Sequence, residues 1–348
     1  MRGICKYFPG VRALHKVDFT LCEGEIHALM GENGAGKSTL IKVLTGVYEK
    51  DEGEIYLKGL DKPAVIHSPQ DAQNLGISTV YQEITLCPNL TVAENMYIGR
   101  TKGIGQKWKK MNRDADKILK SLGIPAEATQ QLSSCSIAVQ QMVAIARAVD
   151  MECKVLILDE PTSSLDDNEV EKLFGLMRDL KAKGVGIIFV THFLDQVYEV
   201  CDKITVLRDG QLVGEYEIEK LPRVQLVAKM LGKELDDMSE IRDESLVYHG
   251  ADESEYVIEA EGLQSNAGIK PFNFHIKKGE VNGFAGLLGS GRSECVRAIF
   301  GADHVTAGSV KVKGKKVKIS KPIDAMKHGI AYLPEDRKVD GIVGDLSV

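Results

Sequence analysis

The 348-residue sequence lacks any long apolar segment. Its longest apolar runs, at 155–158 and 185–190, are far shorter than the roughly 18 residues that a membrane-spanning helix needs. The amino end also lacks a cationic start followed by an apolar stretch, so the sequence predicts no signal peptide. If the protein serves a membrane, we expect it to do so through a partner.

Paired cysteine motifs and blocks of basic residues are missing as well. The seven cysteines form no CxxC pair and no cluster with histidine, which indicates free thiols in a reducing compartment. Lys and Arg are scattered and the formal net charge is -6, so the charge pattern of a nucleic-acid binder is absent and we expect no nucleic-acid partner. A hydrophobic content of 43% is typical of a globular protein with a sizeable core.

A glycine pattern occurs twice, at a spacing of 255 residues (24 to 279). Six glycines of the first half have counterparts in the second half: Gly24, Gly31, Gly36, Gly46, Gly53 and Gly59 fall on Gly279, Gly286, Gly291, Gly301, Gly308 and Gly314. Such a repeat predicts two copies of one folding unit. We expect a first domain at 1–235, an acidic linker at 236–255, and the amino-terminal part of a second copy at 256–348. We also expect the first strand of the first domain to be incomplete.

A phosphate-binding loop is predicted at residues 31–38, which read Gly-Glu-Asn-Gly-Ala-Gly-Lys-Ser and fit the pattern GxxxxGK[ST]. A strand-like stretch at 25–30 precedes the loop and a helix-like stretch at 39–44 follows it. This order directs backbone N–H groups and the positive end of a helix dipole at a phosphate chain. We expect Lys37 to reach the β and γ phosphates and Ser38 to hold Mg²⁺.

Two acidic residues end the apolar run that starts at residue 155. An apolar run that ends in Asp159 and Glu160 is typical of a buried parallel strand whose carboxyl end faces a ligand. We expect Asp159 to coordinate Mg²⁺ through water and Glu160 to polarise the water that attacks the γ-phosphate. His192 follows the next strand-like run, and we expect it at the same sheet edge.

In this order the motifs resemble the nucleotide-binding domain of an ABC-type ATPase, and the resemblance covers essentially the whole chain. It implies an α/β P-loop NTPase fold with a helical subdomain at about 90–150, followed by the start of a second, degenerate copy. Gln82 resembles the glutamine that touches Mg²⁺ and senses the membrane subunit, and residues 163–166 resemble the D-loop. His192 resembles the switch histidine that contacts the γ-phosphate. Phe8 resembles the aromatic that stacks on adenine, although this position suits a core residue too.

The resemblance also implies a set of site residues, with ATP and Mg²⁺ as cofactors. The catalytic residues are Lys37, Gln82, Glu160 and His192, and the metal-binding residues are Ser38, Gln82 and Asp159. The ATP-binding residues are Phe8, Gly31, Glu32, Asn33, Gly34, Ala35, Gly36, Lys37, Ser38, Thr39 and Ser136.

Two motifs depart from the family pattern. The first is the signature motif, where the family has Leu-Ser-Gly-Gly-Gln and this chain has Cys-Ser-Ile-Ala-Val at 135–139. Ser136 keeps its hydroxyl, while a glycine and a polar side chain are lost. The second loop keeps Gly286, Gly291 and Ser293 but has Arg292 in place of the phosphate-binding lysine. Arginine's planar fork does not substitute for a compact ammonium, so we expect this second site to bind nucleotide and to hydrolyse it poorly.

Within the family, the chain resembles the ATP-binding subunit of bacterial monosaccharide importers. The runs at 8–14 and 334–341 carry this resemblance, and the run at 191–197 is most similar to the galactofuranose type. It implies ATP hydrolysis that powers sugar uptake at the cytoplasmic face of the membrane. The implied partners are integral-membrane permease subunits and, through them, an extracytoplasmic sugar-binding protein.

Two alternatives stay open at this point, and one expectation about turnover follows from the resemblance. The alternative function is a soluble twin-domain ABC ATPase that acts on ribosomes. Residues 82–99 suit either a contact with the membrane subunit or an ordinary surface loop. Because each ABC site is completed by the signature motif of the other domain, we expect the truncated chain to bind Mg-ATP and to hydrolyse it slowly.

Overall fold

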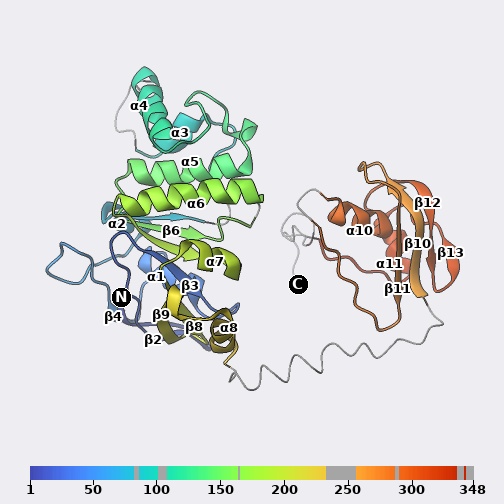
Figure 1. The fold of residues 1–348 in the computed structure, drawn as a ribbon, viewed down its shortest axis with the longest axis horizontal. Coiled ribbons are helices and arrows are strands. Elements are labelled where there is room, and N and C mark those ends of the chain that lie inside the picture. Colours follow the sequence, from blue (N-terminus) through green and yellow to red (C-terminus); the bar gives the residue numbers. More distant parts are fainter. Residues whose placement is uncertain are drawn as a thin grey trace. The chain divides into compact units, whose positions relative to one another are not determined.

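The computed structural model describes residues 1–81, 86–100, 108–163, 165–232, 256–286, 290–334 and 341. The chain divides into two compact units, Met1–Asp243 and Glu244–Val348 (Figure 1). The expected linker at 236–255 lies outside the described residues, and so do Gln82 and Ser164.

A six-stranded sheet forms the centre of the first unit. Its strand order is β5 (Ile77–Val80), β6 (Val155–Asp159), β7 (Gly186–Val190), β3 (Ile26–Met30), β8 (Lys203–Arg208) and β9 (Gln211–Glu217). All neighbours are parallel except β8 and β9. Every residue of β3 and β7 is buried, as expected for parallel strands covered on both faces. This confirms the predicted α/β fold.

Two layers cover this sheet. Helices α5 (Ile137–Asp150) and α6 (Asp167–Ala182) lie on one face, and α1 (Lys37–Leu44) lies on the other (Figure 1). Side chains of β6 point alternately into the two layers. Leu156 and Leu158 pack with α5 and α6, while Ile157 packs with α1. Each fully buried aliphatic side chain of this kind contributes about 1.5–3 kcal/mol.

A smaller antiparallel sheet adjoins α1. Its order is β2 (Val11–Val17), β1 (Arg2–Phe8) and β4 (Glu52–Glu54). The remaining short helices of the first unit are α2 (Pro69–Asn74), α7 (Leu194–Val200), η2 (Ile218–Lys220) and α8 (Arg223–Leu231).

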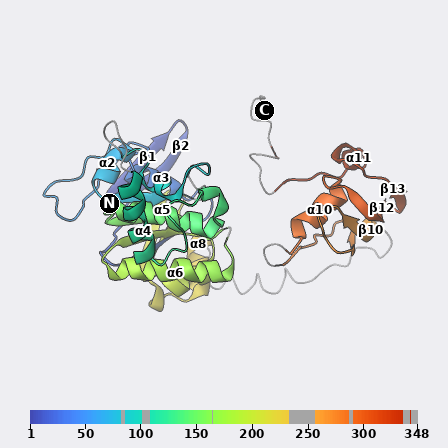
Figure 2. The ribbon, with the colours of Figure 1, turned by 90° about the horizontal axis from the view of Figure 1, so that it is seen from above.

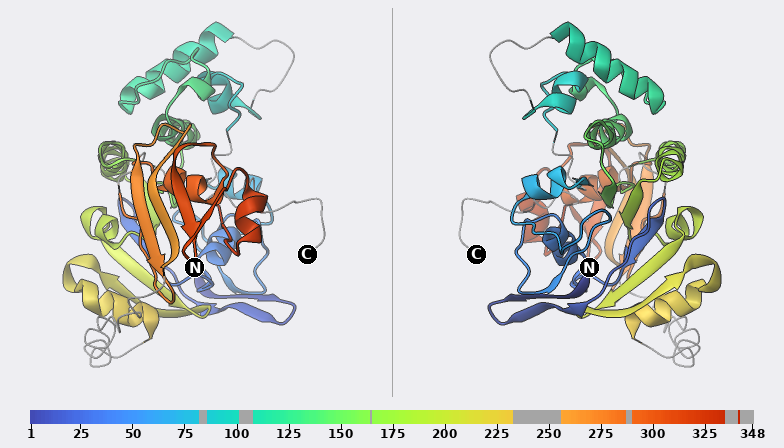
Figure 3. Two further views of the ribbon diagram at one scale, coloured as in Figure 1. Left: turned by 90° about the vertical axis from the view of Figure 1, so that its right-hand side faces the viewer. Right: turned by 90° about the vertical axis from the view of Figure 1, so that its left-hand side faces the viewer.

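Helices also occupy the range 90–150, where the helical subdomain is expected. They are α3 (Val92–Tyr97), α4 (Trp108–Ser121), η1 (Leu132–Ser134) and α5. Helix α4 lies at the end of this group farthest from the six-stranded sheet (Figures 1 and 3). The loop before α3 is held by the fully buried Asn95, which accepts from the Cys87 N–H at 2.7 Å and donates to the Thr91 carbonyl at 3.0 Å.

The second unit repeats the antiparallel part of the first. Its sheet has the order β11 (Phe272–Lys277), β10 (Tyr256–Ser265), β12 (Val305–Val312) and β13 (Lys315–Val317), with α10 (Arg292–Phe300) and α11 (Pro322–Lys327) beside it (Figure 2). By contrast, residues 281–286, the counterpart of β3, form no strand. In the first unit β3 is hydrogen-bonded between β7 and β8, and the described part of the second unit offers no such neighbours.

The sequence repeat also appears in the backbone. Gly53 and its counterpart Gly308 both have φ of 93°, and each lies against the backbone of an earlier glycine, Gly3 or Gly262. A Cβ on Gly53 would lie 2.5 Å from the Gly3 carbonyl oxygen, so a side chain fits neither the conformation nor the space.

We predict that Gly53→Ala lowers the free energy of unfolding of the first unit more than Gly59→Ala does. Both glycines have positive φ, which costs an alanine about 1–2 kcal/mol, but only Gly53 has backbone atoms where the new Cβ would stand. Urea unfolding of both variants measures the difference. Equal losses would show that the close contact contributes nothing.

Candidate nucleotide-binding site

The predicted phosphate loop connects β3 to α1. At two of its glycines, neighbouring backbone atoms leave no room for a Cβ. Gly31 (φ 149°) lies so close to the Leu207 carbonyl that a Cβ would collide with it. Gly36 (φ 103°) precedes α1, and a Cβ there would lie 2.9 Å from the Ala13 carbonyl oxygen. The loop therefore approaches neighbouring backbone more closely than any other residue type permits.

Lys37 is the first residue of α1, and its side chain folds back over the loop. Its ammonium donates hydrogen bonds to the carbonyl oxygens of Gly31 at 2.7 Å and Glu32 at 3.0 Å. Burial lowers the pKa of Lys37, while the charges of Glu160 and Asp159 act in the opposite direction. The ammonium thus lies in the field of both carboxylates that the sequence assigned to the site.

The pairing of β6 with β7 brings the acidic residues and the histidine together. Asp159 is level with Val190, and the Glu160 N–H donates to the Val190 carbonyl at 2.8 Å. His192 follows β7, and its Nδ1 lies 3.4 Å from Glu160 Oε1. The structure therefore places Asp159, Glu160 and His192 at one sheet edge, where the sequence predicts them.

Asp159 is held in an environment that disfavours its charge. Burial raises its pKa above the ordinary value, the adjacent Glu160 carboxylate raises it further, and Lys37 and Lys42 partly oppose both effects. Two neighbouring carboxylates at the end of one strand repel each other, and this repulsion favours the binding of a cation beside them.

A cavity of about 490 Å³ lies above the loop. It is lined by Val11, Arg12, Ala13, Asn33, Gly34, Ala35, Gly36, Lys37, Ser38, Thr39, Asp159, Glu160, Val190, Asp209 and Gly210. The predicted loop residues 33–39 and both acids thus share one concave surface. Drug-sized and cofactor ligands occupy cavities of roughly 300–1,000 Å³, so a nucleotide fits the size.

The β1–β2 hairpin contributes to this cavity, and the sequence analysis missed it. Gly210, in the β8–β9 turn, donates its N–H to the Ala35 carbonyl at 3.1 Å and accepts from the His15 N–H at 2.8 Å. This backbone bridge fixes Arg12 and Ala13 beside the phosphate loop. No sequence motif marks these contacts, because they join segments almost 200 residues apart through main-chain atoms.

A polar group behind the acids also escaped the sequence analysis. Gln196 Oε1 accepts hydrogen bonds from the hydroxyls of Thr162 at 2.7 Å and Thr191 at 3.4 Å. The segment after β6 is thereby tied to the segment after β7. This link fixes the position of Glu160 relative to His192.

Phe8 and Ser136 lie outside the cavity lining, and so do Gly31, Glu32 and His192. The ring of Phe8 stands edge-on to Tyr48 with centroids 5.2 Å apart, under the Lys6 ammonium. Ser136 precedes α5, where its hydroxyl accepts from the Val139 N–H and donates to Glu169. Their proposed nucleotide contacts therefore remain predictions, and Gln82 lies outside the described residues.

The second predicted loop has only part of this geometry. Gly291 (φ 89°) precedes α10 as Gly36 precedes α1, and Arg292 takes the position of Lys37. Arg292 and Ser293 are exposed. Gly286 directly precedes residues 287–289, which lie outside the described residues.

The donor set of the first site fits Mg²⁺. A hydroxyl at the helix start, Ser38, and the half-buried carboxylate of Asp159 line the same cavity, and both offer the oxygen ligands that this cation prefers. A divalent cation would also relieve the repulsion between Asp159 and Glu160. Lys37 supplies one positive charge there, and the raised pKa of Asp159 shows that it does not offset burial and repulsion.

The family model described as "ABC transporter" matches residues 14–163 and 269–343, which include both loops. The chain belongs to the ABC transporter family. The matched residues contain the phosphate loop, Asp159 and Glu160, so the motifs that carry the family are those that line the cavity.

Several relatives are similar over the whole chain. The fructose import ATP-binding protein FruK of Bifidobacterium longum is 50% identical over 351 residues, covering 100% of this chain and 68% of the relative. The galactofuranose transporter ATP-binding protein YtfR of Escherichia coli K12 is 49% identical, covering 99% of this chain and 68% of the relative.

Among the described residues, no helix combines the length and the apolar character needed to cross a membrane.

Solved structures agree on the fold. The ADP conformation of MJ1267, an ATP-binding cassette of an ABC transporter, aligns with a TM-score of 0.59 at 28% identity over 66% of this chain and 95% of that one. The cassette MJ0796, in a dimeric post-hydrolysis state bound to ADP and Pi, aligns with a TM-score of 0.54 at 27% identity over 62% and 97%.

We predict that Asp159→Asn stabilises the nucleotide-free protein at pH 7. The folded-state pKa of Asp159 is raised above its ordinary 3.8, so the folded protein binds the extra proton more tightly than the unfolded chain. The wild-type stability therefore falls as the pH rises from about 3.8 through the raised pKa, and an asparagine removes this loss. Urea unfolding between pH 4 and pH 8 should show an advantage that grows with pH until the raised pKa is passed and then levels off. The exposed Asp61→Asn is the control, and a pH-independent difference would contradict the assignment.

Proposed function

We propose that this chain is the ATP-binding, energy-coupling subunit of an importer that takes a monosaccharide into the cell. The observation that carries the proposal is the convergence of Lys37, Asp159 and Glu160 on one cavity at the end of the parallel sheet. Its relatives named for fructose, galactofuranose and ribose or galactose import support the sugar.

The residues of this cavity have separate roles in phosphoryl transfer to water. The loop N–H groups and the start of α1 hold the phosphates, and Lys37 neutralises charge on the β and γ groups. Glu160 orients and polarises the attacking water, and His192, which touches Glu160, contacts the γ-phosphate. Mg²⁺, held by Ser38, Gln82 and Asp159, supplies further charge stabilisation when bound.

The partners follow from the import function. A permease embedded in the membrane and an extracytoplasmic sugar-binding protein would complete the transporter, and this chain would work at the cytoplasmic face. The structure describes residues 86–99 of the contact region proposed at 82–99, and Asn95 ties the loop at 86–91 to helix α3. The ribosome-acting alternative has no support from the relatives, whose names specify import.

Turnover at the first site requires a second signature motif in our proposal. Ser136 lies outside the cavity that holds Lys37, as expected for a residue that serves the nucleotide of a facing domain. We therefore expect the 348-residue chain to hydrolyse ATP at least about 10-fold more slowly than a version with two complete copies. Steady-state phosphate release compares the two, and equal rates would contradict the requirement.

Glu160→Gln should slow ATP hydrolysis by about 100-fold or more, because the amide cannot act as a base. ATP affinity should change less than about threefold, since Lys37 and the loop remain. Single-turnover hydrolysis and equilibrium ATP binding separate the two effects. The matched control is Glu171→Gln, an exposed carboxylate on α6. Unchanged turnover in Glu160→Gln would remove Glu160 from its role.

The sugar importer itself is tested by uptake. A complex of this chain with its permease and binding protein, reconstituted in vesicles, should accumulate one or more of fructose, galactofuranose, ribose and galactose only when ATP is present on the side of this chain. Failure with every pentose and hexose, in a complex that still hydrolyses ATP, would overturn the substrate class.

A further inference from the structure

Helix α4 presents a stripe of basic side chains to solvent. The basic stripe consists of five exposed residues, Lys109, Lys110, Arg113, Lys117 and Lys120. At 3.6 residues per turn these positions span an arc of about 100° on the helix surface. The buried residues Met111, Ala115 and Leu119 lie on the opposite side of the helix. The stripe therefore points away from the core of the first unit.

The acidic residues of α4 neutralise little of this charge. Asp114 and Asp116 stand at the two edges of the stripe, and both are half-buried. Asp116 accepts a hydrogen bond from the Ala128 N–H at 2.9 Å. Asp114 lies 3.7 Å from Arg113 and 4.0 Å from Lys117, so one carboxylate serves two basic side chains. Most of the positive charge of the stripe stays uncompensated.

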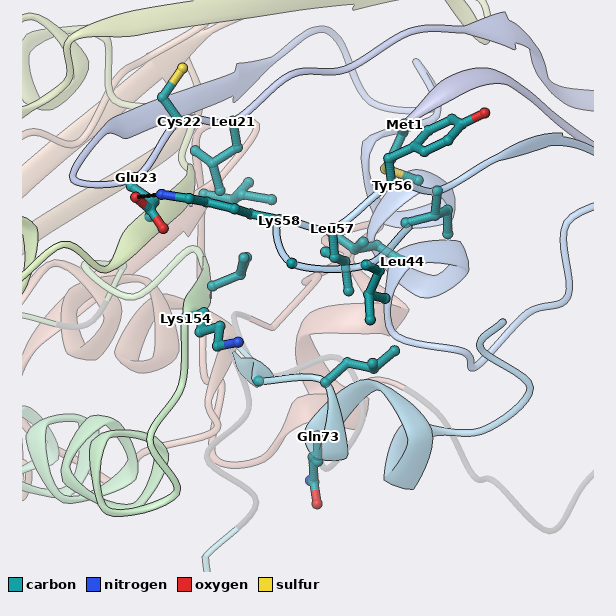
Figure 4. Close-up of a pocket in the computed structure, with 18 of the residues that line it drawn as sticks. Met1, Leu21, Cys22, Glu23, Leu44, Tyr56, Leu57, Lys58, Gln73 and Lys154 are labelled. Atoms are coloured by element: carbon teal, nitrogen blue, oxygen red, sulfur yellow. Dashed lines mark hydrogen bonds and ion pairs between the residues drawn. The ribbon is translucent and has the colours of Figure 1, made fainter. Parts of the chain in front are cut away.

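Other exposed lysines of the first unit have an acidic partner. Figure 4 shows the ion pair between Lys58 and Glu23 at the rim of a cavity of about 430 Å³. Within the part of the chain that the structure describes, Lys109, Lys110 and Lys120 form no ion pair. Their charges are therefore available to a partner outside this chain.

Helix α6 shows how an exposed helix of the same unit is charged. Its exposed charged residues are of both signs, namely Asp167, Glu171, Lys172, Arg178 and Asp179. Basic residues three or four positions apart, such as Lys109, Arg113 and Lys117, repel each other and weaken a helix. Folding alone thus disfavours the stripe, and a chain with a net charge of -6 does not carry it by composition.

Helix α4 adjoins the region that we propose as the contact with the permease. Ala93 and Met96 of α3 belong to the same buried cluster as Ala115 and Leu119 of α4. Helix α4 lies at the end of the helical group farthest from the six-stranded sheet, and it contributes no residue to the nucleotide cavity (Figure 1). The stripe is therefore close to the proposed permease contact and separate from the catalytic site.

We propose that the basic stripe of α4 binds the anionic headgroups of the membrane beside the permease. The negative surface potential of a cytoplasmic leaflet attracts clusters of Lys and Arg, and it decays over a Debye length of about 8 Å at physiological salt. The apolar side of α4 is packed against α3 and α5, so the helix rests on the headgroups without inserting. This inference rests on the proposed function only for the location of the chain at a membrane.

The first test is vesicle binding by the full 348-residue chain, without nucleotide and without permease. Vesicles containing about one-third phosphatidylglycerol in phosphatidylcholine should bind the chain at least about 10-fold more tightly than phosphatidylcholine alone. Raising the salt to about 0.5 M should abolish the difference, because the contact is made by exposed charges. Equal binding to both kinds of vesicle would overturn the proposal.

The position of α4 on the vesicle can be measured directly. Trp108 is the single tryptophan of the chain and the first residue of α4, and it is 50% exposed. Its fluorescence should transfer energy to a dansyl-labelled lipid headgroup in the phosphatidylglycerol vesicles. Binding without energy transfer would show that another surface of the chain contacts the lipid.

The triple variant Lys109→Gln, Lys110→Gln and Lys120→Gln removes three charges and keeps good helix formers. Each basic residue near an anionic surface contributes about 5-fold in affinity, so we expect the variant to bind phosphatidylglycerol vesicles at least about 30-fold more weakly. Its ATP affinity should be unchanged, since α4 lies outside the nucleotide cavity.

The matched control removes three exposed lysines elsewhere, by Lys50→Gln, Lys172→Gln and Lys183→Gln. It should change vesicle affinity less than about threefold, and losses equal to those of the α4 variant would show that only the net charge matters. Tighter binding to duplex RNA than to the vesicles, lost in the α4 variant, would assign the stripe to a nucleic acid instead. Failed sugar uptake with intact vesicle binding would contradict the proposed function and leave the lipid contact standing.

Discussion

The site depends on the parallel register of β3, β6 and β7. Asp159 is paired with Val190, and the Glu160 N–H donates to the Val190 carbonyl. Strands β6 and β7 therefore end side by side at one edge of the sheet. A slip of one residue would turn Asp159 toward the opposite face of the sheet. Main-chain pairing has to hold the acids in place, because Asp159 and Glu160 repel each other and raise the pKa of Asp159.

The motifs that the sequence revealed are those marked by their immediate neighbours in the chain. The phosphate loop and Asp159 stand at the boundaries of short, strongly apolar runs, and such a boundary is visible in the sequence even though distant strands complete the sheet. The bridge through Gly210 to Ala35 and His15 was not predictable, because it joins distant segments by backbone atoms that carry no residue-specific signal. The orientation of Phe8 toward Tyr48 was not predictable either, since an aromatic side chain suits several surroundings.

The repeat shows how far similar sequence determines similar structure. Gly53 and Gly308 make the same close contact in both units, because that contact needs only an antiparallel sheet that each unit builds alone. Residues 281–286 match the β3 region in their glycine pattern and still form no strand. A central parallel strand is stabilised by its neighbours on both sides, so its sequence is a necessary condition for the strand and not a sufficient one.

The hydrogen bonds from Lys37 to the carbonyls of Gly31 and Glu32 have a consequence for the reaction cycle. These oxygens engage two of the three ammonium hydrogens, so a phosphate that takes more than the remaining donor has to displace a backbone oxygen. Part of its binding is then an exchange of acceptors, and the net gain is smaller than the contact itself. Under the proposed function, the same oxygens take the ammonium back when the phosphate leaves, so the loop's own main chain competes with any phosphate for Lys37.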